Sequence, residues 1–380
     1  MTPFTAAHLA SPIEIQRPPI IRFGSGTAAT AGDWAKSKGA RRILVVADAF
    51  NAARVETLNL SGEVAVFGEV RPEPDVPNLE AALRVAEDLR PDLVIGFGGG
   101  SAMDLAKLVA VLPNSGQSLH EVVGPEKVRA KQSLLAQVPT TAGTGSEAGT
   151  RALVTDPATQ NKLAVQSFHM LADIAIVDPD LTLTLPAAVT AASGVDAMAH
   201  CVEAFTSKKA HPLIDIYAIE GVRLVGRFLA RAIRDGSDVE ARAGLCLASL
   251  YGGFCLGPVN TTSGHAVAYP LGTRHHVAHG AANALVFPHT LAFNAPAAPE
   301  KTRAVVEALG LSANGEADVF EATYRYCADL GCEMRLSALG VPRDDLPAMA
   351  REAHAIRRLL DNNPRDISEN EIRAIYEAAY

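Results

Sequence analysis

Asp196 and His200 are the first pair in this sequence whose types and spacing suit chemistry. They lie in the stretch Gly-Val-Asp-Ala-Met-Ala-His (194–200), which is typical of the middle of a helix. Residues four apart leave one helix face together, so a carboxylate and an imidazole there form half of a divalent-metal site. His265 and His279, in stretches without a clear helical period, are candidates for the other half. The spacing alone leaves a surface ion pair as the alternative.

A run of glycines, Gly98-Gly99-Gly100-Ser101, carries the second chemical signal. It follows an apolar strand predicted at 93–97 and precedes a helix predicted at 102–112. Glycines let the backbone approach a ligand, and the free N–H groups at the start of a helix suit a phosphate. A tight turn is the alternative. The run matches neither the dinucleotide fingerprint nor the Walker loop, but its place after a strand favours phosphate binding.

Three further positions suit a nucleotide. The loop Pro-Thr-Thr-Ala-Gly-Thr-Gly-Ser-Glu (139–147) is dense in hydroxyls and glycines and follows a predicted strand at 134–138, at the sheet edge where ligands bind. Asp48 follows a strand at 43–47, where an acid can bind a ribose and repel a 2′-phosphate. It precedes the glycines, so a capping role stays open. Lys162 is by default a surface residue.

Composition excludes several classes of partner. The 380 residues suffice for two domains, and a net charge of -8 offers no basic surface to nucleic acid or anionic lipid. No apolar run approaches the ~18 residues of a membrane span, and no signal peptide is evident at the N-terminus. The few cysteines form no C-x-x-C pair, so we expect reduced thiols and a cytoplasmic protein. They are Cys201, Cys246, Cys255, Cys327 and Cys332.

The elements that must position these residues change in type along the chain. Short apolar runs alternate with helical segments in the first part, which predicts a parallel sheet with helices on both faces. Its strands are expected at 43–47, 64–67, 93–97, 134–138 and 174–177, and its helices at 28–38, 79–89 (with Asn78 as N-cap) and 102–112.

Beyond Pro186 the chain becomes rich in alanine and helical patterns. Helices are expected at 187–206, 215–235, 239–256, 300–309, 319–330, 346–359 and 369–379. The sequence therefore predicts an α/β domain at 1–187 and an all-helical domain at 188–380.

Several long motifs in order show that the chain resembles the iron-activated (group III) alcohol dehydrogenase family over nearly its whole length. The matching stretches are Gly-Gly-Gly-Ser-Ala-Met-Asp-Leu-Ala-Lys (98–107), the loop at 139–147, Gly-Val-Asp-Ala-Met-Ala-His-Cys-Val-Glu (194–203), and the segment from His265 through His279-Gly280 to Pro288-His289. The resemblance implies a Rossmann-like nucleotide domain followed by an all-α metal domain, the dehydroquinate synthase-like fold.

The resemblance also implies a set of site residues. The implied metal ligands are Asp196, His200, His265 and His279, and the implied cofactor-binding residues are Asp48, Gly99, Gly100, Ser101, Thr140, Thr141, Thr144 and Lys162. Among these, Gly100 and Ser101 would hold the pyrophosphate, and Asp48 would favour NAD over NADP.

The implied chemistry is NAD(H)-dependent interconversion of a small alcohol and its aldehyde or ketone. Three imidazoles and a carboxylate suit Fe(II), with Zn(II) as the alternative. Such an ion acts as a Lewis acid on the substrate oxygen, while nicotinamide donates or accepts the hydride. A homodimer is expected from the family.

Tyr269 departs from the family pattern, because many members carry there a histidine thought to relay the proton. A tyrosine, with an unperturbed pKa of about 10, is a poorer shuttle at neutral pH. We interpret Tyr269 as the residue that shapes the substrate pocket, with the proton leaving through ribose hydroxyls or water. A packing role before Pro270 is the alternative.

Five further residues lie near the predicted ligands in the sequence and are not assigned to the metal. Arg274, His275 and His276 form either a solvated cluster or a surface for an anionic substrate such as a short oxo acid. His289 is expected to be structural, and Cys201 to point away from the ligand face into the core.

Three other functions share parts of this pattern. A dehydroquinate synthase-like lyase keeps the fold, but the ligand set argues against it. A maleylacetate reductase-like enzyme usually departs from the motifs kept here. A regulator without turnover would be expected to lack a ligand.

Overall fold

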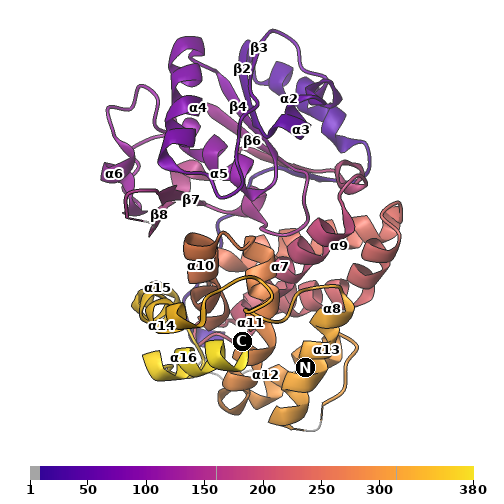
Figure 1. The fold of residues 1–380 in the computed structure, drawn as a ribbon. Coiled ribbons are helices and arrows are strands. Elements are labelled where there is room, and N and C mark those ends of the chain that lie inside the picture. Colours follow the sequence, from indigo (N-terminus) through magenta and orange to yellow (C-terminus); the bar gives the residue numbers. More distant parts are fainter. Residues whose placement is uncertain (1–8, 160, 314) are drawn as a thin grey trace. The chain divides into compact units, whose positions relative to one another are not determined.

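A computed structural model describes residues 9–159, 161–313 and 315–380. The chain divides into two compact units (Figure 1). The first, here the α/β unit, comprises residues 16–141 and 145–183. The second, the helical unit, contains residues 142–144 and 184–380 together with the N-terminal segment up to Ile15.

A six-stranded sheet forms the centre of the α/β unit. Its order is β1-β9-β6-β4-β2-β3 and every pairing in it is parallel. A second sheet has the order β5-β8-β7. The strands are β1 (Ile21–Phe23), β2 (Arg42–Ala47), β3 (Glu63–Phe67), β4 (Leu93–Gly98), β5 (Gly124–Pro125), β6 (Leu134–Pro139), β7 (Arg151–Asp156), β8 (Asn161–Gln166) and β9 (Ile174–Val177).

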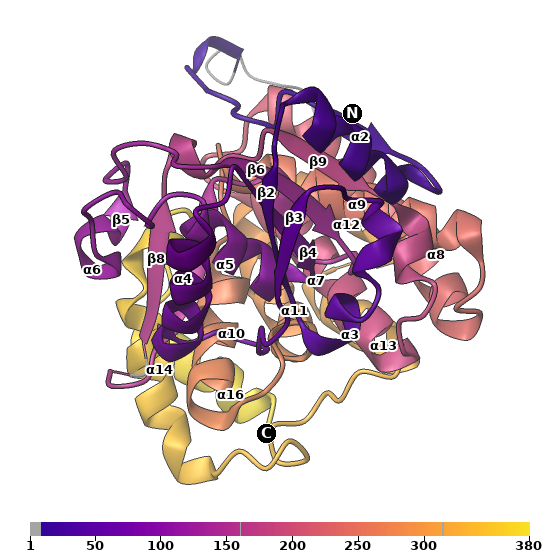
Figure 2. The same cartoon turned by 90° about the horizontal axis from the view of Figure 1, so that it is seen from above.

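The central strands of the main sheet are continuous apolar runs because both of their faces are covered. Alternate residues of β2 belong to two different cores: Leu44 and Val46 pack with the helices α4 and α5, whereas Ile43 and Val45 pack with α2 on the other face (Figure 2). The helices of this unit are α2 (Thr30–Ser37), α3 (Ala49–Ala52), α4 (Val76–Leu89), α5 (Gly100–Val109) and α6 (Leu119–Val122). The five predicted strands of the main sheet are confirmed.

The predicted start of α4 was wrong. Asp75, not Asn78, is the N-cap, and its side chain accepts a hydrogen bond from the Asn78 backbone N–H at 2.9 Å. The Asn78 amide instead donates to the Glu69 carbonyl at 2.9 Å. Pro77 in the first turn supplies the dihedral that lets the helix begin earlier, since the first-turn N–H groups lack partners anyway.

The helical unit holds the rest of the chain. Its helices are α7 (Ala187–Thr206), α8 (Pro212–Arg234), α9 (Val239–Leu256), α10 (Ser263–His275), α11 (His279–Asn294), α12 (Pro299–Ala308), α13 (Glu316–Asp329), α14 (Leu346–Ala355), α15 (Arg357–Leu360) and α16 (Glu369–Ala378). The predicted helices in this part are confirmed, except that 346–359 is interrupted at Ile356. Within the described ranges, no helix has the length and apolar character that crossing a membrane requires.

Two helices that sequence patterns did not reveal, α10 and α11, lie in this unit. Each contains an internal proline, Pro270 in α10 and Pro288 in α11, which weakens the local helical signal. Both are nevertheless buried along most of their length, and packing in a core outweighs intrinsic propensity. These helices carry His265 and His279.

Candidate functional site

Helix α7 places Asp196 and His200 inside the helical unit. Asp196 is 3% exposed and His200 is 5% exposed, so the surface ion pair considered from spacing alone does not describe them. The helix packs so closely on α8 that a side chain on Gly194 would come within 2.3 Å of Leu229. A buried carboxylate needs compensating partners.

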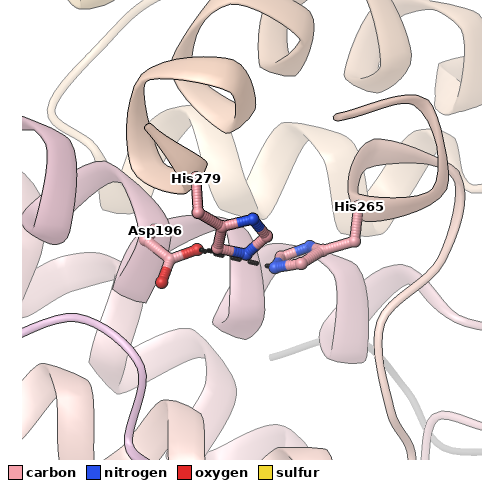
Figure 3. Close-up of side chains that lie close together, drawn as sticks. All are labelled: Asp196, His265 and His279. Carbon is pink, nitrogen blue, oxygen red and sulfur yellow. Dashed lines mark ion pairs between the residues drawn. The ribbon is translucent and has the colours of Figure 1, made fainter. Parts of the chain in front are cut away.

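The other two histidines converge on that carboxylate. The Nε2 atoms of His265 and His279 each lie 3.5 Å from Asp196 Oδ1, and Figure 3 shows the three side chains pointing toward one another. His200 Nε2 lies 3.8 Å from the same oxygen, and its ring stacks on that of His265 with centroids 4.6 Å apart. Residues from α7, α10 and α11 therefore meet at one carboxylate.

The spacing of these atoms fits a metal ion. One ligand atom each from Asp196, His265 and His279 lies within 4.8 Å of the others. Metal bonds of about 2.0–2.2 Å in a tetrahedron put neighbouring ligand atoms about 3.3–3.6 Å apart. The two separations of 3.5 Å from Asp196 fall in this range, and the 3.8 Å to His200 lies just beyond it.

The ionisable side chains of this cluster shift one another's pKa values. Burial acts to raise the pKa of Asp196, but the imidazoles of His200, His279 and His265 outweigh it and hold that pKa well below the usual range. Burial lowers the pKa of His200 to about 4, which leaves its ring neutral at physiological pH, as a metal ligand must be. The pKa of His265 is raised to about 10, because Glu203 and Asp196 outweigh the effect of burial.

Two residues that sequence patterns did not single out hold the ligands. Glu203 Oε1 lies 2.6 Å from His265 Nδ1, and the Asn283 amide donates to Asp196 Oδ1 at 2.8 Å. Helical spacing contained the signal: Glu203 follows Asp196 by seven positions on α7, and Asn283 follows His279 by four on α11.

Tyr269 lies beside the cluster, one turn after His265 on α10. Its ring centroid is 6.4 Å from that of His265 and 5.7 Å from that of His279. The Arg358 guanidinium lies over the Tyr269 ring, 5.6 Å from its centroid. The side chain is half-buried and packs against the core of the helical unit.

The cluster at the end of α10 is engaged with acidic side chains. Arg274 donates to Glu352 at 2.8 Å, and His275 Nε2 lies 3.3 Å from Asp345. His276 ends the helix in a left-handed conformation, with φ 55°. These contacts favour the surface cluster over an anion-binding surface.

Cys201 and His289 are structural groups of the helical unit. Cys201 is fully buried, and its thiol lies 3.9 Å from the Ala248 carbonyl. The His289 ring packs on Phe320 with centroids 4.9 Å apart, and burial lowers its pKa to about 4.

The glycine run begins α5 in the α/β unit. Gly99 is the N-cap, and Gly100 and Ser101 are the first helical residues. A side chain on Gly99 would come within 3.4 Å of the Thr141 hydroxyl, so Thr141 lies against this helix start. The helix begins at Gly100, two residues before the predicted start at 102. The backbone of the glycine run itself therefore lies at the positive end of the helix dipole.

Asp48 and Thr140 meet at the same edge of the sheet. Asp48 caps α3 by accepting from the Asn51 backbone N–H at 3.0 Å. The Asn51 amide donates to Asp48 at 2.5 Å and to the Thr140 hydroxyl at 3.2 Å. Gly98 adjoins this group, since a side chain there would reach 3.3 Å from Asp48.

Lys162 and Thr144 are placed differently from the other cofactor candidates. Lys162 lies on β8 of the small sheet, and its ammonium group pairs with Glu73. Thr144 belongs to the segment 142–144 of the helical unit, where Gly143 packs against Ser193.

Comparison with known proteins identifies the class of this chain. A sequence model of "Iron-containing alcohol dehydrogenase" matches residues 18–179, and one of "Fe-containing alcohol dehydrogenase family, C-terminal" matches residues 190–380. Long-chain-alcohol dehydrogenase 1 of Geobacillus thermodenitrificans is 36% identical over 96% of this chain and 95% of its own length.

Two further relatives agree with this match. The 1,3-propanediol dehydrogenase of Klebsiella pneumoniae is 33% identical over 96% of this chain and 97% of its own length. A crystal structure of 1,3-propanediol oxidoreductase superposes with a TM-score of 0.93 at 32% identity, covering 97% of this chain and 100% of that one. The chain belongs to the iron-containing alcohol dehydrogenase family. It has the dehydroquinate synthase-like fold and is an oxidoreductase that acts on alcohols and the corresponding carbonyl compounds.

Proposed function

We propose that this enzyme interconverts a small alcohol and its aldehyde or ketone with NAD(H), using a metal ion held by Asp196, His200, His265 and His279. The observation that carries the proposal is the convergence of ligand atoms from α7, α10 and α11 on one buried oxygen of Asp196. Imidazole and carboxylate donors without a thiolate suit Fe(II), our proposed metal, and also accept Zn(II).

Each group of residues has a defined task. The bound metal ion supplies a Lewis acid for the substrate oxygen, and bound NAD supplies the hydride acceptor. Asp196 and the three imidazoles hold the cation in a buried position. Tyr269 borders the ligand set and limits the size of the substrate.

The α/β unit supplies the proposed cofactor site. The free N–H groups of Gly99, Gly100 and Ser101 at the start of α5 suit the pyrophosphate. The Asp48 carboxylate accepts a hydrogen bond from a ribose hydroxyl of the cofactor, and its charge repels a 2′-phosphate. The hydroxyl groups of Thr140 and Thr141 and the ammonium group of Lys162 complete the proposed lining within this unit.

The direct test is NADH consumption by protein reconstituted with Fe(II) or Zn(II). The substrates are short aldehydes, 3-hydroxypropanal, long-chain aldehydes, short oxo acids and diketones, with a chelator-treated sample as control. The names of the relatives motivate the propanediol and long-chain members of the panel. Metal-dependent turnover on any of them supports the proposal. Lack of turnover by protein that binds both metal and NADH contradicts it and favours the lyase-like reaction.

We also propose that the enzyme is a cytoplasmic homodimer. Five cysteines without a C-x-x-C pair suit a reducing compartment. The dimer is carried over from the family resemblance, and light scattering of the purified protein tests it. A monomer mass across the micromolar range would contradict it.

A further inference from the structure

We propose that Glu203 is a positioning residue that fixes the orientation and tautomer of His265 and thereby sets how tightly the site binds its metal. The inference rests on the proposed function of Asp196 and the three histidines as metal ligands. It concerns a residue outside that ligand set.

Glu203 is held rigidly by donors on both of its oxygens. Oε1 lies 2.6 Å from His265 Nδ1. Oε2 accepts from the Thr262 backbone N–H at 2.6 Å, from the Thr262 hydroxyl at 3.0 Å and from the His265 backbone N–H at 3.3 Å. The residue is 7% exposed. A carboxylate with this many fixed partners cannot rotate without breaking buried hydrogen bonds.

This contact determines which nitrogen of His265 carries the proton. An imidazole that binds a metal ion through one nitrogen is neutral and carries a single N–H on the other, and a carboxylate can only accept a hydrogen bond. Nδ1 must therefore donate to Glu203, which leaves the Nε2 lone pair directed toward the ligand cluster, 3.5 Å from Asp196 Oδ1. The same contact orients the ring and raises its strength as a donor to a metal.

The backbone before His265 is shaped around the carboxylate. A side chain on Gly264 would come within 2.7 Å of Glu203 Oε1 and 2.9 Å of its carboxyl carbon. The start of α10 therefore closes over Glu203 only because residue 264 is glycine.

The three imidazoles are not held alike. His200 Nδ1 is buried and has no hydrogen-bond partner among the residues that the structure describes. His265 thus has a fixed tautomer, whereas His200 depends on the metal and on packing for its orientation. We expect the loss of Glu203 to weaken the site through His265 specifically.

The test compares metal affinity between wild type and Glu203→Gln by competition with a chromophoric chelator, with Co(II) and Zn(II) as probes. The glutamine side chain has a single accepting oxygen, so it cannot accept both from His265 Nδ1 and from the backbone N–H groups of Thr262 and His265 as the carboxylate does. We expect affinity to fall about 10- to 100-fold, as for other partners of metal-bound histidines. The visible absorption band of the Co(II) protein should also change, which a purely structural role would not cause. Glu220→Gln, an exposed change on α8, is the matched control and should leave both quantities unchanged.

A folded Glu203→Gln protein with Co(II) and Zn(II) affinities within twofold of wild type would overturn the inference. If this variant does not fold, Thr262→Val decides, because it removes one donor to Glu203 Oε2 and keeps the contact with His265. We expect it to weaken Co(II) binding severalfold, and unchanged binding would overturn the inference. A wild-type protein that binds neither metal would instead refute the proposed function itself.

Discussion

At the scale of single residues, the position of Tyr269 argues for a steric role. Its ring lies beside His265 and His279 and under the guanidinium group of Arg358. Tyr269→Phe should therefore keep turnover within about threefold of wild type, less than the about 100-fold loss expected for a general acid. NADH oxidation with the best substrate measures this. Tyr269→Ala, the control that removes the ring, should change substrate preference. A Tyr269→Phe enzyme without turnover would assign the hydroxyl a catalytic role.

The Asp48 side chain caps α3 and is also proposed to favour NAD over NADP. Asp48→Asn keeps an N-cap, since asparagine caps helices as well as aspartate does, but removes the charge. We expect the preference for NADH over NADPH, as a ratio of kcat/KM, to fall about 10-fold, which corresponds to about 1.4 kcal/mol. Asp75→Asn, the same change at the N-cap of α4, is the control and should leave the ratio unaltered. An unaltered ratio in Asp48→Asn would remove Asp48 from the specificity determinants.

At the scale of elements, the loop that follows β6 contains a buried carboxyl group. Glu147 is 1% exposed, and its Oε2 has no hydrogen-bond partner among the described residues. Burial raises its pKa to about 7, an effect that Lys107 offsets only in part. Between about pH 4.3, the value for an unfolded chain, and pH 7, the folded protein retains a proton that the unfolded chain releases. This group therefore makes folding less favourable as pH rises through that window.

Glu147→Gln should remove this pH dependence. Relative to wild type, we expect the free energy of unfolding at pH 8 to increase by on the order of 1–3 kcal/mol, with a smaller difference at pH 5. Urea unfolding at the two pH values measures it, and Glu80→Gln on the exposed face of α4 is the control. Equal effects of Glu147→Gln at both pH values would mean that Glu147 is ionised throughout this range.

The contact between α11 and α7 sets where His279 lies. Gly280 is the second residue of α11, and a side chain there would come within 2.2 Å of the Ala192 carbonyl oxygen on α7. Gly280→Ala should push the helices apart, which we expect to cost about 1–3 kcal/mol in stability and to weaken metal binding. Thermal unfolding and chelator competition measure the two effects. Gly257→Ala is the control, because nothing lies within 4 Å of its added carbon. Unchanged metal affinity in Gly280→Ala would separate this packing contact from the site.

At the scale of the whole molecule, the proposed metal ligands all belong to the helical unit. A ligand that binds only the folded state stabilises it, by about 4 kcal/mol at a thousand times its Kd. We expect added Zn(II) to increase hydrogen-exchange protection most in α7, α10 and α11, and least in the strands of the α/β unit. Mass spectrometry of exchanged peptides measures this, with Gly280→Ala as the weakened site. Uniform protection would mean that the two units unfold together.

Most strands and helices of the α/β unit, and many residues of the proposed site, could be predicted from the sequence. Short apolar runs identified the buried strands of the main sheet, and α7 and α9 were predicted with their observed bounds. Three features were missed for local reasons. The strand β1 is only three residues long. The strands β7 and β8 of the small sheet each have only three apolar residues, with polar residues on both sides. Pro77 let α4 begin before its predicted cap.

The residue types and their spacing determined by themselves that Asp196 and His200 share a helix face, and that glycines follow a strand. These are properties of neighbours along the chain, and the helical and strand periods fix them. Only the tertiary structure decided that α10 and α11 form despite their prolines, that His265 and His279 meet at Asp196, and that Glu203 lies behind His265. Such contacts join residues more than 60 positions apart, as in the pair Glu203 and His265, and depend on how helices pack, which no local pattern encodes.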